Sequence, residues 1–211
     1  MKLLGYGFLF ALFLLQKGFS ATPLDFSEYR FGQNNRRFFE TIIKDLMIEY
    51  GQPVTTSYGK DFQAKIDRIV VDEDKMEKYL KETQNPKEQE AIARFILAHE
   101  YFHVALKHVQ TSDRVRSVDG VEILGTFSEA RKQMEQQVDH LAAKYLHQLG
   151  LPTEPVQRLF LSHPEFHGGD SYPSAQERVD SVLRGARPGI EESYFDNQFI
   201  KCTFAFRALV R

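Results

Sequence analysis

Residues 94–108 read RFILAHEYFHVALKH, and the interpretation of the whole chain depends on them. Two histidines and a glutamate, His99, Glu100 and His103, interrupt a segment that is otherwise mostly apolar and has the residue spacing of a helix. Buried polar side chains cost free energy unless they are paired or bind a metal. The segment therefore predicts either a partly exposed helix or a buried helix that contributes to a binding site.

The sequence before this stretch gives the helix a clear beginning. Asn85 is a good N-cap residue, Pro86 suits the first helical position, and Glu88 follows three residues after the cap. One face of the helix would then carry Ile92, Phe95, Ile96, His99, Phe102, His103 and Leu106. Both histidines are thus expected on the buried face.

The residues from His99 to His103 match the pattern HExxH. Side chains four residues apart on a helix have Cβ atoms about 5–6 Å apart, so two imidazoles there can bind one Zn²⁺. Glu100 would flank the ion without binding it. From that position its carboxylate can take a proton from a water that the metal activates and pass it to a leaving amine.

A catalytic zinc site usually has three protein ligands, so a third is expected downstream. The candidates are Glu122, Glu129, Glu135, Asp139, His140, His147, His163 and His167. A helix predicted over residues 127–150 has an apolar stripe, and Glu135 and Asp139 fall within or beside that stripe, whereas His140 and His147 do not. We expect Glu135 to complete the ligand set and Asp139 to hydrogen-bond the free nitrogen of a ligand histidine.

The remaining pattern predicts an α+β fold that is mostly helical, with a small β-sheet edge and with the HExxH helix packed on the second ligand-bearing helix. A helix ending at Gly51 and a strand within residues 65–72 precede the HExxH helix, and residues 53–62 are either a loop or an edge strand. Short helices are expected at 74–82, at 154–163 and, after a capping box formed by Ser174 and Glu177, at 175–185.

The first twenty residues have the layout of a secretory signal peptide. Lys2 precedes the apolar run 3–15, and Gly18 and Ser20 provide small residues for cleavage after residue 20. A retained membrane anchor is the alternative, but a transmembrane helix needs about 20 apolar residues. We therefore expect residues 21–211 to form a single exported domain with no stable transmembrane anchor; its oligomeric state stays open.

Composition limits the cellular setting and the partners. The formal net charge is −2 and no block of lysine or arginine occurs, so nucleic acid is not an expected partner. Cys202 is the single cysteine, which excludes an intramolecular disulfide. An exported protein without disulfides fits the bacterial periplasm or an extracellular location.

Taken in order along residues 66–184, several motifs resemble the HtpX-like and CAAX-prenyl-endopeptidase-like zinc metallopeptidases. They are AIARFILAHEYFHVALKH, then EQQVD at the start of EQQVDHLAAKYLHQLGLPTEPVQRLF, then YPSAQERVDSVL with its arginine, Arg178. The resemblance implies a zincin-like fold that binds one Zn²⁺ per chain and hydrolyses peptide bonds. It also implies that the zinc ligands are His99, His103 and Glu135, that Glu100 is the general base, and that Asp139 supports the ligands without binding the metal.

The chain departs from that family in two places. Family members often have histidine where this chain has Tyr172, which is then either a stabiliser of the transition state or a plain turn residue. The hairpin that usually precedes the HExxH helix also looks shortened.

Two functions of different classes are consistent with these features. The first is an exported zinc endopeptidase acting on protein or peptide substrates, for example in quality control of envelope proteins. The second is a zinc-binding module without proteolytic activity that serves as a chaperone or binds a partner. The intact Glu100 favours the enzyme, because zinc binding alone does not need it, and the shortened hairpin favours the module.

Overall fold

The computed structural model describes residues 22, 24–109, 124–166 and 172–187. The predicted signal peptide, residues 1–20, lies outside these ranges, as do Glu122, His167 and Cys202. Within them the elements are η1 (Phe26–Glu28), α2 (Arg36–Tyr50), β1 (Thr55–Tyr58), β2 (Gln63–Ala64), β3 (Arg68–Val71), α3 (Glu73–Leu80), α4 (Pro86–Ala105), α6 (Leu124–Gln148), α7 (Glu154–Ser162), η2 (Pro164–Phe166) and α8 (Ala175–Gly185). The prediction of a mostly helical α+β fold is confirmed.

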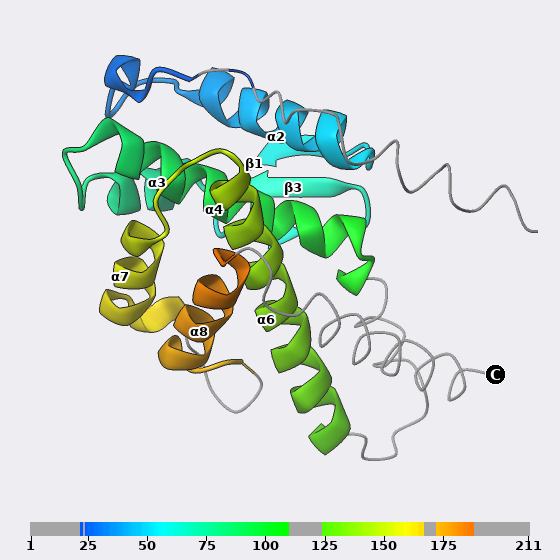
Figure 1. The fold of residues 1–211 in the computed structure, drawn as a ribbon. Helices are drawn as coiled ribbons and strands as arrows, with labels where there is room; N and C mark the ends of the chain where they lie inside the picture. Colours follow the sequence, from blue (N-terminus) through cyan, green and yellow to red (C-terminus); the bar gives the residue numbers. More distant parts are fainter. Residues whose placement is uncertain (1–21, 23, 110–123, 167–171, 188–211) are drawn as a thin grey trace, which may run out of the picture.

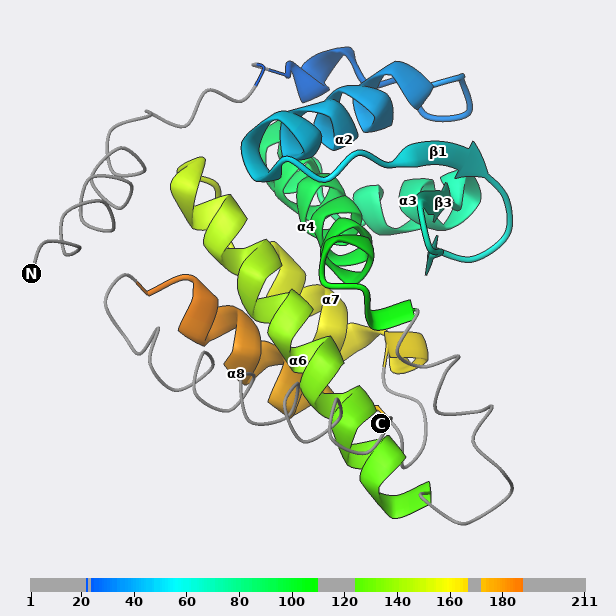
Figure 2. The same cartoon turned by 90° about the vertical axis from the view of Figure 1, so that its right-hand side faces the viewer.

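Helix α4 lies in the middle of the molecule. The sheet and α2 lie on one side of it, and α6, α7 and α8 lie on the other (Figure 1). Helix α6 crosses α4 in this view (Figure 1), and the turned view shows it running alongside α8 (Figure 2). In the described part of the chain, none of the helices combines the length and the apolar composition that crossing a bilayer requires.

The sheet has three strands in the order β1-β3-β2. β1 pairs with β3 in parallel, with Thr55 opposite Arg68, and β2 pairs with β3 antiparallel. The central strand β3 buries Ile69, Val70 and Val71 in succession, which is typical of a strand covered on both faces. The predicted strand within residues 65–72 is β3, and the segment left open between loop and strand contains β1.

Local signals account for the limits of the helices. The side chain of Asn85 accepts a hydrogen bond from the backbone N–H of Lys87 at 3.0 Å, so α4 begins as predicted. Gly51 and Gly150 follow α2 and α6 with φ of 77° and 66°, a left-handed backbone that glycine adopts without steric cost. Ser174 opens α8 with a capping box.

Helix α4 is buried on more sides than its sequence pattern indicates. Ala91 and Ala93 lie on opposite sides of the helix, and both are 0% exposed. Arg94 is also buried. Its guanidinium donates hydrogen bonds to Glu90, Asp45 and the hydroxyl of Tyr145, which offset the cost of burying its charge. Paired in this way, the arginine does not leave an isolated charge inside the protein.

Candidate metal centre

The crossing of α4 and α6 brings His99, His103 and Glu135 together. His99 and His103 are one turn apart on α4, and Glu135 comes from α6. Glu135 Oε2 lies 3.2 Å from His99 Nε2 and 3.6 Å from His103 Nε2, and the two Nε2 atoms are 3.2 Å apart. Two imidazole nitrogens and one carboxylate oxygen therefore face a common point.

These separations fit the ligands of a single ion. With metal–ligand bonds of about 2.0–2.2 Å and tetrahedral angles, two ligand atoms lie about 3.3–3.6 Å apart. Within the described ranges, this is the one group of three or more histidine, cysteine, aspartate or glutamate side chains arranged so that it could hold a metal ion.

The second nitrogen of His99 is fixed by a buried ion pair. His99 Nδ1 lies 2.9 Å from Asp139 Oδ1, and Asp139 is 0% exposed. A carboxylate only accepts hydrogen bonds, so Nδ1 is the donor, and in the neutral imidazole Nε2 keeps its lone pair for a metal. Arg178 of α8 donates to both oxygens of Asp139, at 2.8 and 2.7 Å. These hydrogen bonds connect three helices, α4, α6 and α8, on the side of His99 that faces away from the metal group.

The second nitrogen of His103 faces another histidine. His103 Nδ1 lies 3.1 Å from Nδ1 of His108, which follows the end of α4 and is 5% exposed. Burial, with a smaller effect of His103, lowers the pKa of His108 to about 3. The sequence analysis did not include His108 in the site, because a histidine next to Lys107 at the end of a helix is typical of a positive charge that favours the helix C-terminus.

The charges of the centre compensate one another. Burial would raise the pKa of Glu135, but His103 and His99 outweigh it and hold this pKa well below its usual value. Burial would lower the pKa of His99, but the hydrogen bonds to Asp139 and Glu135 outweigh it and raise the value to about 9. The carboxylates therefore favour a positive charge at this point, whether a proton or a metal ion supplies it.

Glu100 lies beside the centre and not within it. It is the neighbour of His99 on α4 and is half-buried. Burial is the main cause that raises its pKa. No hydrogen bond from a described residue occupies its carboxylate. A carboxylate that no described side chain binds, and that lies outside the group of His99, His103 and Glu135, is available for proton transfer.

Tyr172 contacts α6 one turn before Glu135. Arg131 donates a hydrogen bond to the Tyr172 hydroxyl, and its guanidinium carbon lies 4.1 Å from the centre of the tyrosine ring. The side chain is half-buried. The hydrogen bond and the ring contact of Tyr172 are with Arg131 and not with His99, His103 or Glu135, and the role in transition-state stabilisation stays a prediction.

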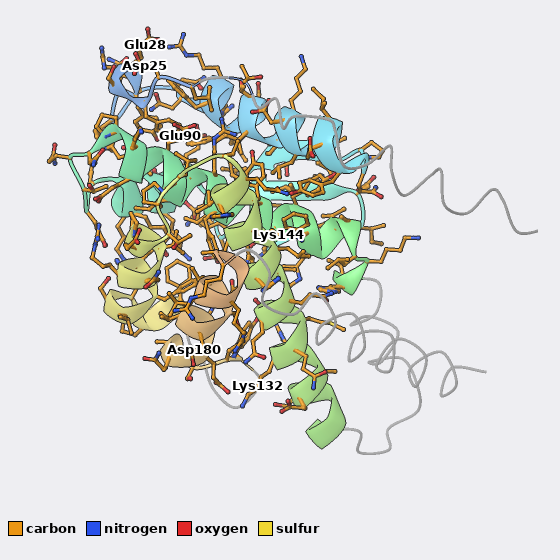
Figure 3. All side chains as sticks on the ribbon, in the orientation of Figure 1. Asp25, Glu28, Glu90, Lys132, Lys144 and Asp180 are labelled. Atoms are coloured by element: carbon orange, nitrogen blue, oxygen red, sulfur yellow. The ribbon has the colours of Figure 1, made fainter. Side chains whose placement is uncertain are left out.

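The other described candidates for a third ligand lie elsewhere. His147 and Glu129 are exposed, His163 pairs with Glu82, and His140 is half-buried with a pKa lowered chiefly by burial. Many carboxylates among the described residues are ordinary surface groups, such as Asp25 and Glu28, which lie at the outer edge of the molecule beside η1 (Figure 3).

In comparisons with known proteins, no family model, no curated protein and no solved structure matches the chain.

Proposed function

We propose that this protein is a zinc-dependent endopeptidase that binds one Zn²⁺ through His99, His103 and Glu135 and uses Glu100 as the general base. The observation that carries the proposal is the set of separations of 3.2–3.6 Å between two histidine nitrogens and one carboxylate oxygen. Carboxylate and imidazole groups could form hydrogen bonds at these distances without a metal. The adjacent Glu100 and the two occupied Nδ1 atoms favour the metal.

The donor set suits zinc. Zinc binds imidazole nitrogen and carboxylate oxygen in tetrahedral geometry, and its catalytic sites have three protein ligands with one position left for water or substrate. When bound, zinc supplies a Lewis acid that polarises a carbonyl oxygen and makes water more acidic. The zincin-like arrangement of the HExxH helix against a second ligand-bearing helix is part of this proposal.

Glu100 would move the proton during peptide hydrolysis. Its carboxylate accepts a proton from the attacking water and delivers that proton to the amine that leaves. Burial raises the pKa of Glu100, which brings it closer to the working pH and makes the second transfer easier. The side chain of Glu100 is not fully buried, so water can reach it.

The resemblance to HtpX-like and CAAX-prenyl-endopeptidase-like metallopeptidases supports the same assignment, as does the order of its motifs along residues 66–184. The signal peptide predicted over residues 1–20 supports the proposal that the protein acts in the bacterial periplasm or outside the cell. Its substrates would then be proteins or peptides of that compartment.

A second function is favoured by one observation, the small size of the sheet. The strand β2 spans only Gln63–Ala64 and the strand β1 only Thr55–Tyr58. An extended peptide bound at a sheet edge gains affinity from backbone hydrogen bonds, and these short edges provide few. The alternative is therefore a zinc-binding module without proteolytic activity that acts as a chaperone or binds a partner.

Glu100→Gln separates the two functions. This variant keeps the zinc ligands but removes the base, so zinc content should be unchanged while cleavage of labelled unfolded casein falls by about 10²–10⁴-fold. Glu129→Gln, at an exposed carboxylate on α6, is the matched control and should cleave like the wild type. A zinc-loaded wild-type protein that cleaves none of a panel of unfolded proteins and peptides would favour the module.

A further inference from the structure

His108 reaches His103 through an uncommon backbone turn. Helix α4 ends at Ala105, and Lys107 has φ of 60°, which lies in the left-handed region. Residues other than glycine, asparagine and aspartate adopt this conformation infrequently because Cβ crowds the backbone. Beyond this turn the His108 imidazole lies against His103, five residues earlier.

The contact between the two imidazoles is specific. The Nδ1 atoms lie 3.1 Å apart, and the rings meet edge to face with their centres 5.2 Å apart. His108 is 5% exposed and His103 is half-buried, so water has little access to this hydrogen bond. A pair of nitrogens at this distance requires one donor and one acceptor.

A metal on His103 Nε2 decides which nitrogen is the donor. Nε2 must offer a lone pair to the ion, so the proton of the neutral His103 imidazole must be on Nδ1. His103 Nδ1 then donates, and His108 Nδ1 must accept. The proton of the neutral His108 imidazole is then on Nε2, a buried atom to which the described residues offer no hydrogen-bond partner. The opposite arrangement would place the His103 proton on Nε2, directed at the other ligand atoms, where it would exclude a metal.

We propose that His108 is a positioning residue for the metal centre, which accepts the hydrogen bond from His103 Nδ1 and so holds the His103 ring in the orientation and tautomer that bind the ion. The proposal rests on the proposed function, because it requires a metal at His103 Nε2. It gives the centre two supports: the carboxylate of Asp139 orients His99, and the neutral imidazole of His108 orients His103. Hydrogen-bond partners of ligand histidines affect metal affinity strongly.

Zinc affinity measured by competition with a chromophoric chelator tests this role. In the purified full chain, His108→Leu removes the acceptor and should weaken zinc binding by about 10–100-fold. His108→Asn keeps an acceptor near the position of Nδ1 and should recover most of the affinity. His147→Leu, at an exposed histidine of α6, is the matched control and should bind zinc like the wild type.

The tautomers give a second readout that requires no variant. In zinc-loaded wild-type protein with ¹⁵N-labelled histidine, NMR should show His103 protonated at Nδ1, and His108 protonated at Nε2 with a bare Nδ1. His108 protonated at Nδ1 would overturn the proposal, and this result remains decisive if His108→Leu does not fold.

The outcomes distinguish this proposal from the proposed function. If the wild type and His108→Leu bind zinc equally well while Glu135→Gln does not, the metal centre stands and the role of His108 is wrong. If the folded wild type binds no zinc, the metal centre fails and the role of His108 fails with it. Weak binding in His108→Leu with recovery in His108→Asn supports both.

Discussion

Replacing Arg178 with methionine removes the charge that neutralises a fully buried carboxylate. The guanidinium donates to Asp139 at 2.8 and 2.7 Å, Asp139 is 0% exposed and Arg178 is 6% exposed. Methionine keeps an unbranched apolar side chain beside Phe160, over whose ring the guanidinium carbon lies at 4.1 Å. The change therefore removes the charge and its hydrogen bonds more than it removes packing.

The expected loss of stability is large. Removing one partner of a buried ion pair costs about 3–5 kcal/mol, because the other charge stays buried without compensation. For a chain of this length each kcal/mol shifts the melting temperature by about 2–4 °C. Arg178→Met should therefore lower the melting temperature by about 6–20 °C. Adding Asp139→Asn should recover part of the loss, because the amide removes the buried charge and still accepts from His99.

Thermal unfolding followed by far-ultraviolet circular dichroism suits this chain, which contains no tryptophan. A chelator in every sample removes any contribution from metal binding. Arg37→Met is the matched control, because Arg37 pairs with Glu28 at the surface, where the two side chains are 70% and 61% exposed, and the expected effect is about 0–1 kcal/mol. Equal melting temperatures for Arg178→Met and Arg37→Met would refute the reasoning about the buried pair.

The remaining predictions concern a helix contact and pH. Gly185→Ala should destabilise the protein by about 1–3 kcal/mol, because its Cβ would lie 2.2 Å from the backbone oxygen of His140; an unchanged urea midpoint would contradict this. In metal-free protein, Asp139 and Glu135 raise the pKa of His99 to about 9 despite burial. The stabilisation from His99 is then complete below its unfolded pKa of about 6.5 and is lost as pH rises through 9. The free energy of unfolding, measured in chelator, should therefore fall over this range. An unchanged free energy of unfolding would contradict the raised pKa of His99. Zinc must displace the proton of His99. Below pH 9 the apparent affinity for zinc should therefore increase by about tenfold for each unit by which the pH rises, and chelator competition at several pH values measures this slope.

Much of the fold could be predicted because its signals are local. Asn85 and Pro86 set the beginning of α4, and Gly51 and Gly150 set the ends of two other helices. The parallel pairing of β1 with β3 could not be predicted, because it depends on contacts between segments that the sequence pattern does not connect. The burial of α4 on opposite sides was missed for the same reason.

The candidate site divides in a similar way. The helical phase of residues 127–150 directs Glu135 and Asp139 inward, and the structure places them against the histidines of α4. The sequence alone allows Arg178 either a structural ion pair or a contact with the carboxylates of the site. Its hydrogen bonds to Asp139 are both, because Asp139 also bonds His99. His108 was missed because its position depends on the left-handed backbone of Lys107 and not on helical spacing.

The metal content of the purified protein tests the central claim most directly. Wild type and Glu135→Gln would be exposed to zinc, dialysed against metal-free buffer and measured by atomic spectrometry, with circular dichroism to show that both are folded. We expect about one zinc ion per wild-type chain, because three ligands hold one ion, and a sharp loss in the variant. A folded wild-type protein that retains no zinc at any concentration would contradict it.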